Sequence, residues 1–273
     1  MRQSGREFYK MSGSGNDFVF VDAREEPAGR LADRSVIAAI CARGTGVGAD
    51  GIVFLERSER ADFGMRYLNS DGSVAALCGN ASLCAARLAV ELGAVDPHSF
   101  AFETSDGIIA ARIRHGAVEI DLQQPRDVRT DVAEIQLERG ERRLGFALVG
   151  VPHAVVLCDD VAALDVGRRG RALRHDSAFP EGANVDFLAR TGAQWRYRTF
   201  ERGVEGETLA CGTGAVACAV LAKAWGLAGD LVHLRTSSGL LQTVQLPGEG
   251  ATLHPSLSGE ARIVFQGRFA ELS

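Results

Sequence analysis

One short motif occurs twice in this chain of 273 residues, as Cys78-Gly79-Asn80 and again as Cys211-Gly212-Thr213. Each copy opens a run of small and apolar residues that predicts a helix, over residues 81–92 and 215–225. Each run meets a glycine 15 residues after its cysteine. We therefore expect two thiols at the starts of two similar helices.

The start of a helix is a special place for a thiol. Unpaired backbone N–H groups and a partial positive charge stabilise an anion there, so the thiol should ionise more easily and act better as a base or nucleophile. The same N–H groups can hold a carboxylate or phosphate beside the sulfur. Gly79 and Gly212 leave the backbone open to a ligand. One such motif would often be structural, but its duplication favours a functional interpretation.

The similarity between the halves continues beyond these helices and indicates an internal repeat. The segment 104–107 follows the first helix and the segment 236–239 follows the second, and both read Thr-Ser-x-Gly before an alternating apolar stretch. A polar residue stands nine positions before each cysteine, Asn69 in one half and Arg202 in the other. We expect an α+β fold of two pseudo-symmetric lobes, because an apolar helix must be surrounded. Each lobe would be a mixed, mostly antiparallel sheet curled around its central helix.

The expected boundary between the lobes lies in the charged stretch 121–145, although this stretch could also be a solvated hairpin within one lobe. We expect residues 1–130 to form the first lobe and residues 131–273 the second. If the lobes face each other, the helix starts converge on a cleft, a favoured place for a ligand. Alternating apolar patterns predict strands at 51–55, 63–68, 118–122, 184–188 and 194–200. Shorter runs predict two further helices, at 33–41 and 161–173, and Asp33 could cap the first.

Composition excludes several classes of function. A net charge of −5 offers no electrostatic footprint for nucleic acid. No apolar run approaches the roughly 18 residues of a membrane span, and no signal peptide is visible, so we expect a cytoplasmic protein without a membrane partner. The six cysteines are too few for a disulfide scaffold and lack the spacing of a metal site. We interpret the four outside the repeated motif as buried apolar residues: Cys41, Cys84, Cys158 and Cys218.

Two like groups on opposite walls of one pocket suit the inversion of a stereocentre. One cysteine, as thiolate, would remove a proton from carbon, and the other, as thiol, would supply a proton to the opposite face. Amino-acid racemases often use pyridoxal phosphate held on a lysine. This chain has only Lys10 and Lys223, neither beside a recognisable phosphate loop. We therefore expect no cofactor and a small-molecule substrate.

Several motifs occur in order along most of the chain and in both halves. They are Met11-x3-Gly15-Asn16-Asp17-Phe18, Gly48-Ala49-Asp50-Gly51, Asn69-x-Asp71-Gly72-Ser73, Cys78-Gly79-Asn80, Pro152-His153, Glu181-Gly182-x-Asn184, Glu201-Arg202-Gly203, Glu207-Thr208 and Ala210-Cys211-Gly212-Thr213-Gly214. With these motifs the sequence resembles the diaminopimelate epimerase family, whose members act without a cofactor in the pathway to lysine and peptidoglycan precursors.

The resemblance implies interconversion of LL- and meso-diaminopimelate by Cys78 and Cys211, within the two-lobed fold and compatible with a homodimer. It implies that four residues at the helix starts hold the carboxylate at the reacting carbon: Gly79, Asn80, Gly212 and Thr213. It implies that five others hold the ammonium and the distal end of the substrate: Asn16, Asn69, Asn184, Glu201 and Arg202.

Several alternatives stay open at this point. The two amides Asn16 and Asn69 could be turn residues, and Glu201 with Arg202 could be an exposed pair. His153 is interpreted as a satisfied core histidine, although the resemblance places it near a cysteine. Val151 stands where many family members carry an asparagine that contacts substrate, which favours a racemase of another amino acid as the rival. Ala81 and Leu83 also depart from the family pattern, since glycine and arginine are common at these positions. A thiol redox protein and a binding protein without chemistry are the remaining classes.

Overall fold

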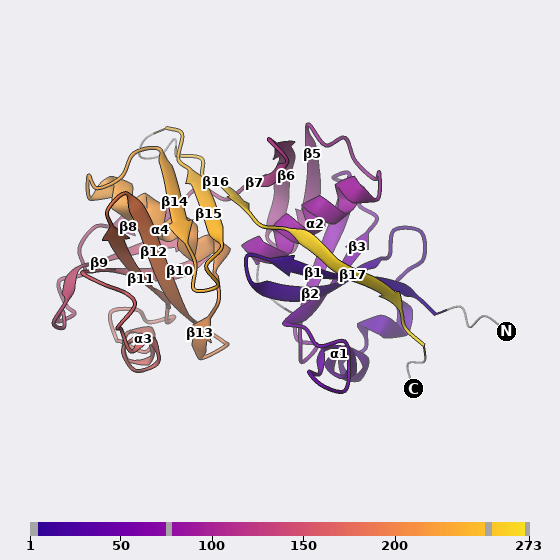
Figure 1. The fold of residues 1–273 in the computed structure, drawn as a ribbon, viewed down its shortest axis with the longest axis horizontal. Helices are drawn as coiled ribbons and strands as arrows, with labels where there is room; N and C mark the ends of the chain where they lie inside the picture. The colour runs from indigo at the N-terminus through magenta and orange to yellow at the C-terminus, as the bar shows by residue number, and fades with distance from the viewer. Residues whose placement is uncertain (1–4, 75–77, 249–252, 271–273) are drawn as a thin grey trace. The chain divides into compact units, whose positions relative to one another are not determined.

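The computed structural model describes residues 5–74, 78–248 and 253–270. It divides into two compact units, one of residues 1–120 with 260–273 and the other of residues 121–259. The C-terminal segment joins the first unit, unlike the expected division, because β17 (Arg262–Arg268) pairs antiparallel with β1 (Glu7–Gly13). The yellow β17 lies beside the indigo β1 in Figure 1. In the described part of the chain, no helix is long and apolar enough to cross a membrane.

The first unit is built on eight strands that neighbour one another in the order β17-β1-β2-β3-β4-β5-β6-β7 within the described residues. The β2–β3 and β4–β5 pairs are parallel and the other pairs are antiparallel. The remaining strands are β2 (Asn16–Asp22), β3 (Gly51–Glu56), β4 (Phe63–Asn69), β5 (Phe100–Thr104), β6 (Gly107–Arg114) and β7 (Ala117–Asp121). The helices are η1 (Gly29–Ala32), α1 (Arg34–Cys41) and α2 (Gly79–Glu91).

The second unit repeats this arrangement, with eight of its described strands in the order β8-β9-β10-β11-β12-β14-β15-β16, and the short β13 pairs antiparallel with β12 as an addition. Again the third–fourth and fifth–sixth pairs, β10–β11 and β12–β14, are parallel and the others are antiparallel. Its strands are β8 (Arg126–Arg129), β9 (Glu141–Val149), β10 (Val151–Cys158), β11 (Asn184–Thr191), β12 (Gln194–Glu201), β13 (Gly206–Thr208), β14 (Leu231–Arg235), β15 (Leu241–Gln245) and β16 (Ser256–Gly259). Its helices are α3 (Val166–Arg174) and α4 (Gly212–Ala224).

The identical strand order and pairing sense confirm the internal repeat and the expected α+β class. The charged stretch 121–145 was expected either to join the lobes or to form a hairpin within one lobe. The units divide at residues 120 and 121, and residues 126–149 then form the antiparallel β8–β9 pair within the second unit.

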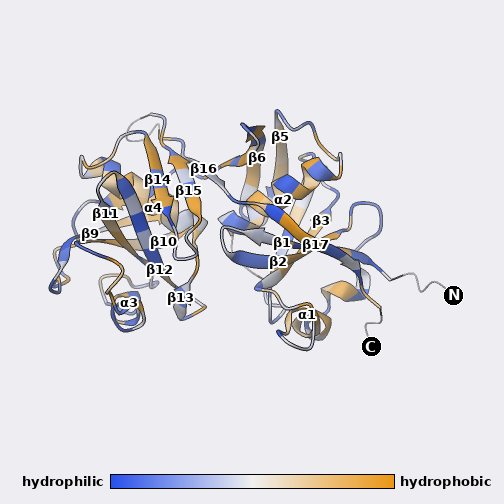
Figure 2. Cartoon of the chain, viewed as in Figure 1, coloured by the Kyte–Doolittle hydropathy of each residue, from blue (hydrophilic) through white to orange (hydrophobic). Residues whose placement is uncertain are grey.

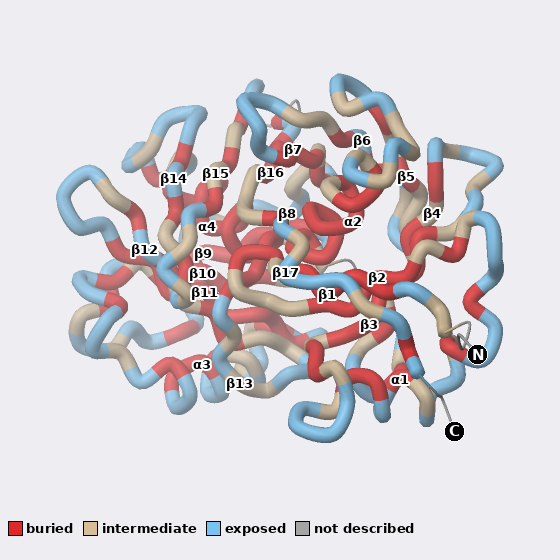
Figure 3. The backbone as a smooth tube through the Cα atoms, turned by 45° about the vertical axis from the view of Figure 1, so that its right-hand side comes forward, coloured by how far each residue is buried: buried red, intermediate tan, exposed pale blue. Residues whose placement is uncertain are grey.

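Each unit surrounds one long helix with its sheet. In the first unit α2 packs against β1, β2, β3, β4 and β17, and in the second α4 packs against β9, β10, β11, β12, β15 and β16. Residues 212–222 of α4 are all buried, and both helices appear red along most of their length in Figure 3. A helix that is apolar on every side must be buried, and its alanines and glycines let the strands approach closely. Figure 2 shows hydrophobic residues along α4, β14 and β15, whereas β2 and β12 also carry hydrophilic residues.

The shorter helices cover the other face of each sheet. α1 packs against β3, and Ile37 and Ile40 join a core with Phe54. α3 packs against β11 and β12, where Leu173 joins a core with Phe187. Asp165 caps α3 by accepting the Arg168 N–H at 3.0 Å. Asp33 is the N-cap residue of α1, as predicted, but its side chain makes no capping hydrogen bond to the helix.

Candidate active site

The two cysteines of the repeated motif occupy the same structural position in their units. Cys78 is the N-cap of α2 with φ −112° and ψ 111°, and Cys211 is the N-cap of α4 with φ −131° and ψ 115°. The carbonyl of each accepts the first helical hydrogen bond at 2.9 Å, from Ser82 and Ala215 respectively. Both helices have 13 residues. The predicted helix starts are confirmed, two to three residues earlier than the apolar pattern suggested.

Cys211 is held by both its backbone and its sulfur. The Tyr197 hydroxyl from β12 accepts the Cys211 N–H at 3.1 Å and lies 2.9 Å from the Cys211 carbonyl oxygen. The sulfur accepts the Gly214 N–H at 3.4 Å and lies 3.5 Å from Thr213 Oγ1. The thiol therefore takes the place that a serine or aspartate side chain takes at an ordinary N-cap. It points at the N–H groups that open α4.

Burial raises the pKa of the Cys211 thiol well above its ordinary value, and the carboxylates of Glu201 and Asp186 act in the same direction. The Thr213 hydroxyl and the Gly214 N–H lower it, but by less. The helix start therefore acts in the expected direction, through the Gly214 N–H, but it does not set the direction of the net pKa shift. Desolvation of a buried anion outweighs the helix N-terminus here. Cys78, in contrast, is only half-buried.

Behind Cys211 lies a chain of buried polar side chains that the sequence did not reveal. His153 of β10 approaches Asp186 of β11 with its Nδ1 2.7 Å from Oδ2, and approaches Thr213 with its Nε2 3.0 Å from Oγ1. The Thr199 hydroxyl donates to the other oxygen of Asp186 at 2.6 Å. His153 and Asp186 are fully buried. His153 is thus a satisfied core histidine, as interpreted, yet one hydroxyl separates it from Cys211.

The first unit places two of the expected binding residues in contact beside Cys78. Asn80, the second residue of α2, donates to Asn16 Oδ1 at 2.7 Å, and Asn16 in turn donates to Asp50 Oδ2 at 3.0 Å. Asp50 is held by Arg43 at 2.7 Å, and Arg43 also binds Asp17 at 2.6 Å. A carboxylate only accepts, so Asp50 fixes which way both amides face. Asn16 also closes the β1–β2 turn opposite Gly13, so it is both a turn residue and part of this network.

The third amide of this unit, Asn69, lies at the end of β4. Its Nδ2 donates to the Ser73 hydroxyl at 3.0 Å, and its N–H donates to the Ser73 carbonyl at 2.9 Å. Asn69 therefore shapes the turn that runs towards Cys78. Residues 75–77, immediately before Cys78, lie outside the described part of the chain.

In the second unit, the remaining expected residues lie close together at the ends of β11 and β12. Asn184 Oδ1 accepts the Arg202 N–H at 2.8 Å, and Arg202 Nη1 donates to the Glu181 carbonyl at 3.0 Å. Glu201 accepts a hydrogen bond from the Thr208 hydroxyl. Glu201 and Arg202 are both partly buried rather than exposed. Each has its own partner in the unit.

Asp186, Thr199 and Asp50 are the polar residues that sequence reasoning missed. Asp186 lies between apolar residues of β11, and Thr199 lies at a buried position of the alternating strand β12. A polar residue at an inward-facing strand position is the signal that would have identified them. Asp50 was noted only as part of a family motif. Among the described residues, no group of three or more His, Cys, Asp or Glu is arranged to hold a metal ion.

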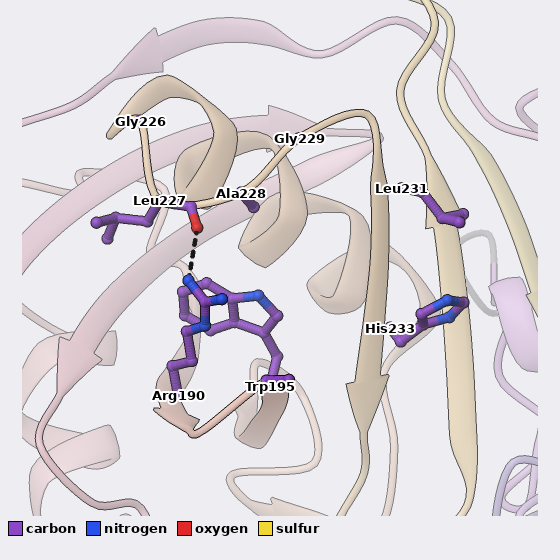
Figure 4. A pocket seen from close by; sticks show the side chains of 9 residues that line it. Arg190, Trp195, Gly226, Leu227, Ala228, Gly229, Leu231 and His233 are labelled. Carbon is purple, nitrogen blue, oxygen red and sulfur yellow. Dashed lines mark hydrogen bonds between the residues drawn. The ribbon is translucent and has the colours of Figure 1, made fainter.

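A surface cavity of about 300 Å³ lies in the second unit, away from these residues (Figure 4). It is lined in part by Arg190, Trp195, Leu227 and His233, and Arg190 donates to the Leu227 carbonyl at 3.1 Å. Gly226, also in its wall, follows the C-terminal end of α4. A helix of this length spans roughly 20 Å, so the cavity is remote from Cys211 and is not part of the candidate active site.

Comparison with known proteins gives one consistent answer. A family model described as diaminopimelate epimerase matches residues 8–126 and 145–264. A protein named diaminopimelate epimerase from Gemmatimonas aurantiaca is 47% identical over an alignment covering 97% of this chain and 99% of that protein. Another of that name from Aquifex aeolicus is 39% identical, with 97% and 98% covered.

Solved structures share the fold. A phenazine biosynthesis protein of the PhzF family from Bacillus anthracis matches with a TM-score of 0.74 at 16% identity, covering 98% of this chain and 99% of that chain. A hydroxyproline epimerase from Agrobacterium vitis matches with a TM-score of 0.71 at 19% identity, covering 98% and 92%. The likeness to these two structures concerns the fold alone and confirms the α+β class. The family model and the curated relatives together show that this chain belongs to the diaminopimelate epimerase family.

Proposed function

We propose that this chain is an isomerase that interconverts LL- and meso-diaminopimelate without a cofactor, using Cys78 and Cys211 as the acid–base pair. The observation that carries the proposal is the identical placement of the two thiols, each as the N-cap of a buried 13-residue helix in one copy of a repeated unit. A reaction that is nearly symmetric about one carbon needs two nearly equivalent groups. The two thiols would act on opposite faces of the same substrate carbon.

In one direction, one cysteine as thiolate would take the α-proton and the other as thiol would give a proton to the opposite face. The electron pair left on carbon would delocalise into the adjacent carboxylate. The N–H groups that open the two helices would stabilise that negative charge in a site from which water is excluded. Four residues supply those donors: Gly79, Asn80, Gly212 and Thr213.

The far end of the substrate carries a second ammonium and carboxylate. Arg202 would bind the carboxylate, and Glu201 would accept from the ammonium. Asn16, Asn69 and Asn184 would complete the set, since an amide can both donate and accept. Val151 stands where an asparagine contact is common in the family, so these residues would carry more of the distal recognition.

The test is to prepare Cys78→Ser and Cys211→Ser and to measure both epimerisation and exchange of the α-proton with deuterated solvent. Each variant should lose epimerisation by about 10³-fold or more, because serine is a far weaker acid than a thiol. Near-native epimerisation by either variant would refute the two-base mechanism. A panel of L-amino acids in deuterated water separates the proposed substrate from a rival one, because only the true substrate gains deuterium rapidly.

The finer assignments of location and assembly also belong to this proposal. All six cysteines are free thiols in the structure, a state that persists most readily in the reducing cytoplasm. We expect the purified protein to form a homodimer, which light scattering after size-exclusion chromatography would test. A monomeric mass together with full activity would refute the homodimer.

A further inference from the structure

Five side chains of the second unit form an unbroken line of contacts that ends at Cys211 Sγ. The line runs from Thr199 to Asp186, His153, Thr213 and Cys211, with successive separations of 2.6, 2.7, 3.0 and 3.5 Å. Each of these residues is less than a tenth exposed. Three strands and the start of α4 are needed to assemble it.

The chemistry of the groups fixes the direction of most of these bonds. The Asp186 carboxylate only accepts, so one oxygen takes the Thr199 proton and the other takes the proton on His153 Nδ1. His153 Nε2 is then the ring nitrogen that can gain or lose a proton. It faces the Thr213 hydroxyl, which carries a single proton and lies between the nitrogen and the Cys211 sulfur.

Only two proton arrangements then satisfy the line. In the first, the Cys211 S–H donates to Thr213 Oγ1 and the Thr213 O–H donates to His153 Nε2. In the second, the Thr213 O–H donates to the Cys211 thiolate and a protonated His153 Nε2 donates to Thr213 Oγ1. Passing between them moves the sulfur proton to the threonine oxygen and the threonine proton to the imidazole. No atom is gained or lost and the net charge of the cluster is unchanged.

The coupling to His153 is important because ionisation of the Cys211 thiol alone is unfavourable. Burial raises the pKa of its thiol, and Glu201 and Asp186 raise it further. Other titratable groups facing it are Tyr197 and Cys218, whose own pKa values burial also raises. Transfer to His153 forms a thiolate without adding net charge to this desolvated cluster, and Asp186 lies against the imidazolium that results.

We propose that the Thr213 hydroxyl is a proton relay between Cys211 and His153, and that Asp186 is the positioning residue that makes the relay work by holding the proton on His153 Nδ1. The inference rests on the proposed function, because it explains how a buried thiol serves as a base. It assigns a task to Asp186 and Thr199, and adds a proton-transfer task to the substrate contact expected of Thr213.

The first experiment compares the pH dependence of kcat for Thr213→Val, which removes the hydroxyl at nearly constant shape, with that for Thr213→Ser, which keeps it. The valine variant should lose about 10²-fold near neutral pH. Its rate should then rise about tenfold per pH unit, as bulk base ionises Cys211 directly. The serine variant should keep the native pH profile. An equal loss at every pH in the valine variant, or the same profile in both variants, would overturn the relay.

Asp186→Asn should show the same rise of kcat with pH, since the imidazolium loses its counter-charge. Because both changes break one relay, the double variant Asp186→Asn/Thr213→Val should be no slower than the slower single variant. Losses that multiply would instead mean two independent roles and would overturn the proposal.

A second measurement needs neither activity nor a folded Asp186 variant. In native protein labelled with ¹⁵N-histidine, the His153 signals, assigned by their loss in His153→Gln, should show the ring proton on Nδ1, which faces Asp186, and none on Nε2, which faces Thr213. A neutral ring with its proton on Nε2 would overturn the proposal. Since this spectrum does not depend on substrate, it separates a failure of the relay from a failure of the proposed function, which the cysteine variants test.

Discussion

Gly214 is a helical glycine whose replacement by alanine should destabilise the protein, against the usual trend. Alanine is normally preferred to glycine inside a helix by up to about 1 kcal/mol. A Cβ at Gly214, however, would lie 2.3 Å from Asp186 Oδ1, whereas ordinary contact begins at 3.4 Å. The carboxylate would have to retreat by about 1 Å, or α4 would have to shift by as much.

The size of the effect follows from what that retreat breaks. Asp186 holds His153 at 2.7 Å and Thr199 at 2.6 Å, both inside the core. Hydrogen bonds to a charged group contribute about 1.5–3 kcal/mol each, and weakening both should cost about 3 kcal/mol. Subtracting the helix preference leaves a net destabilisation of about 2 kcal/mol.

Urea unfolding followed by tryptophan fluorescence is the appropriate assay. The chain has two tryptophans, Trp195 and Trp225, and both lie in the second unit with Gly214. With a slope of about 2 kcal/mol per M, the unfolding midpoint should fall by about 1 M urea.

Gly167 provides a matched control within the same unit. It is the second residue of α3, and a Cβ there would lie 3.6 Å from its nearest neighbour, an ordinary contact. Gly167→Ala should therefore leave the midpoint unchanged or raise it. If Gly214→Ala raised the midpoint as much as Gly167→Ala, the reasoning from the Asp186 contact would be refuted.

Two further changes have expected outcomes of known sign. Tyr197→Phe removes the hydroxyl that accepts the Cys211 N–H at 3.1 Å and leaves that buried donor unpaired, so it should lower the unfolding free energy of the second unit by about 1–3 kcal/mol; an unchanged urea midpoint would contradict this. Asp17 lies in the first unit, where burial alone would raise its pKa. Hydrogen bonds and charges from Arg43 and Lys10 outweigh burial and hold this pKa below its ordinary value. A carboxyl group whose pKa is lower in the folded state stabilises that state above its unfolded pKa of about 4. This stabilisation is lost as the pH falls through the lower pKa of the folded state. Calorimetry from pH 7 down into that acid range should therefore show a steeper loss of stability in the native protein than in Asp17→Asn, and parallel curves would count against the Asp17 network.

The helix starts could be predicted because their causes are local. A run of alanines and other small residues between Cys78 and Gly93, or between Cys211 and Gly226, indicates a buried helix whatever surrounds it. The repeat followed from comparing the two runs, and the equal strand orders confirm it. The last strand could not be placed in this way. Residues 262–268 join β1 by pairing across almost the whole chain, and a pairing partner so distant leaves no mark in the local pattern.

The candidate site also contains features that the sequence predicted and features that it did not. Cysteine, asparagine and arginine beside glycine-rich turns were recognisable from motifs. The environment of Cys211 was not, because the same helix start that should ionise a thiol lies in a core that opposes ionisation. The pKa of this thiol depends on how much water the fold removes and on which carboxylates it brings near, and neither quantity is encoded in neighbouring residues.

The sequence by itself determined that two equivalent thiols open two equivalent helices, since that depends on short-range patterns and on their duplication. Only the tertiary structure decided what stands behind Cys211. Asp186, His153 and Thr213 come from β11, β10 and α4, and none predicts the others along the chain. They meet because parallel pairing of β10 with β11 sets the register that brings their side chains over the start of α4. Hydrogen bonds between side chains require closeness in space, and closeness in space is what folding adds to a sequence.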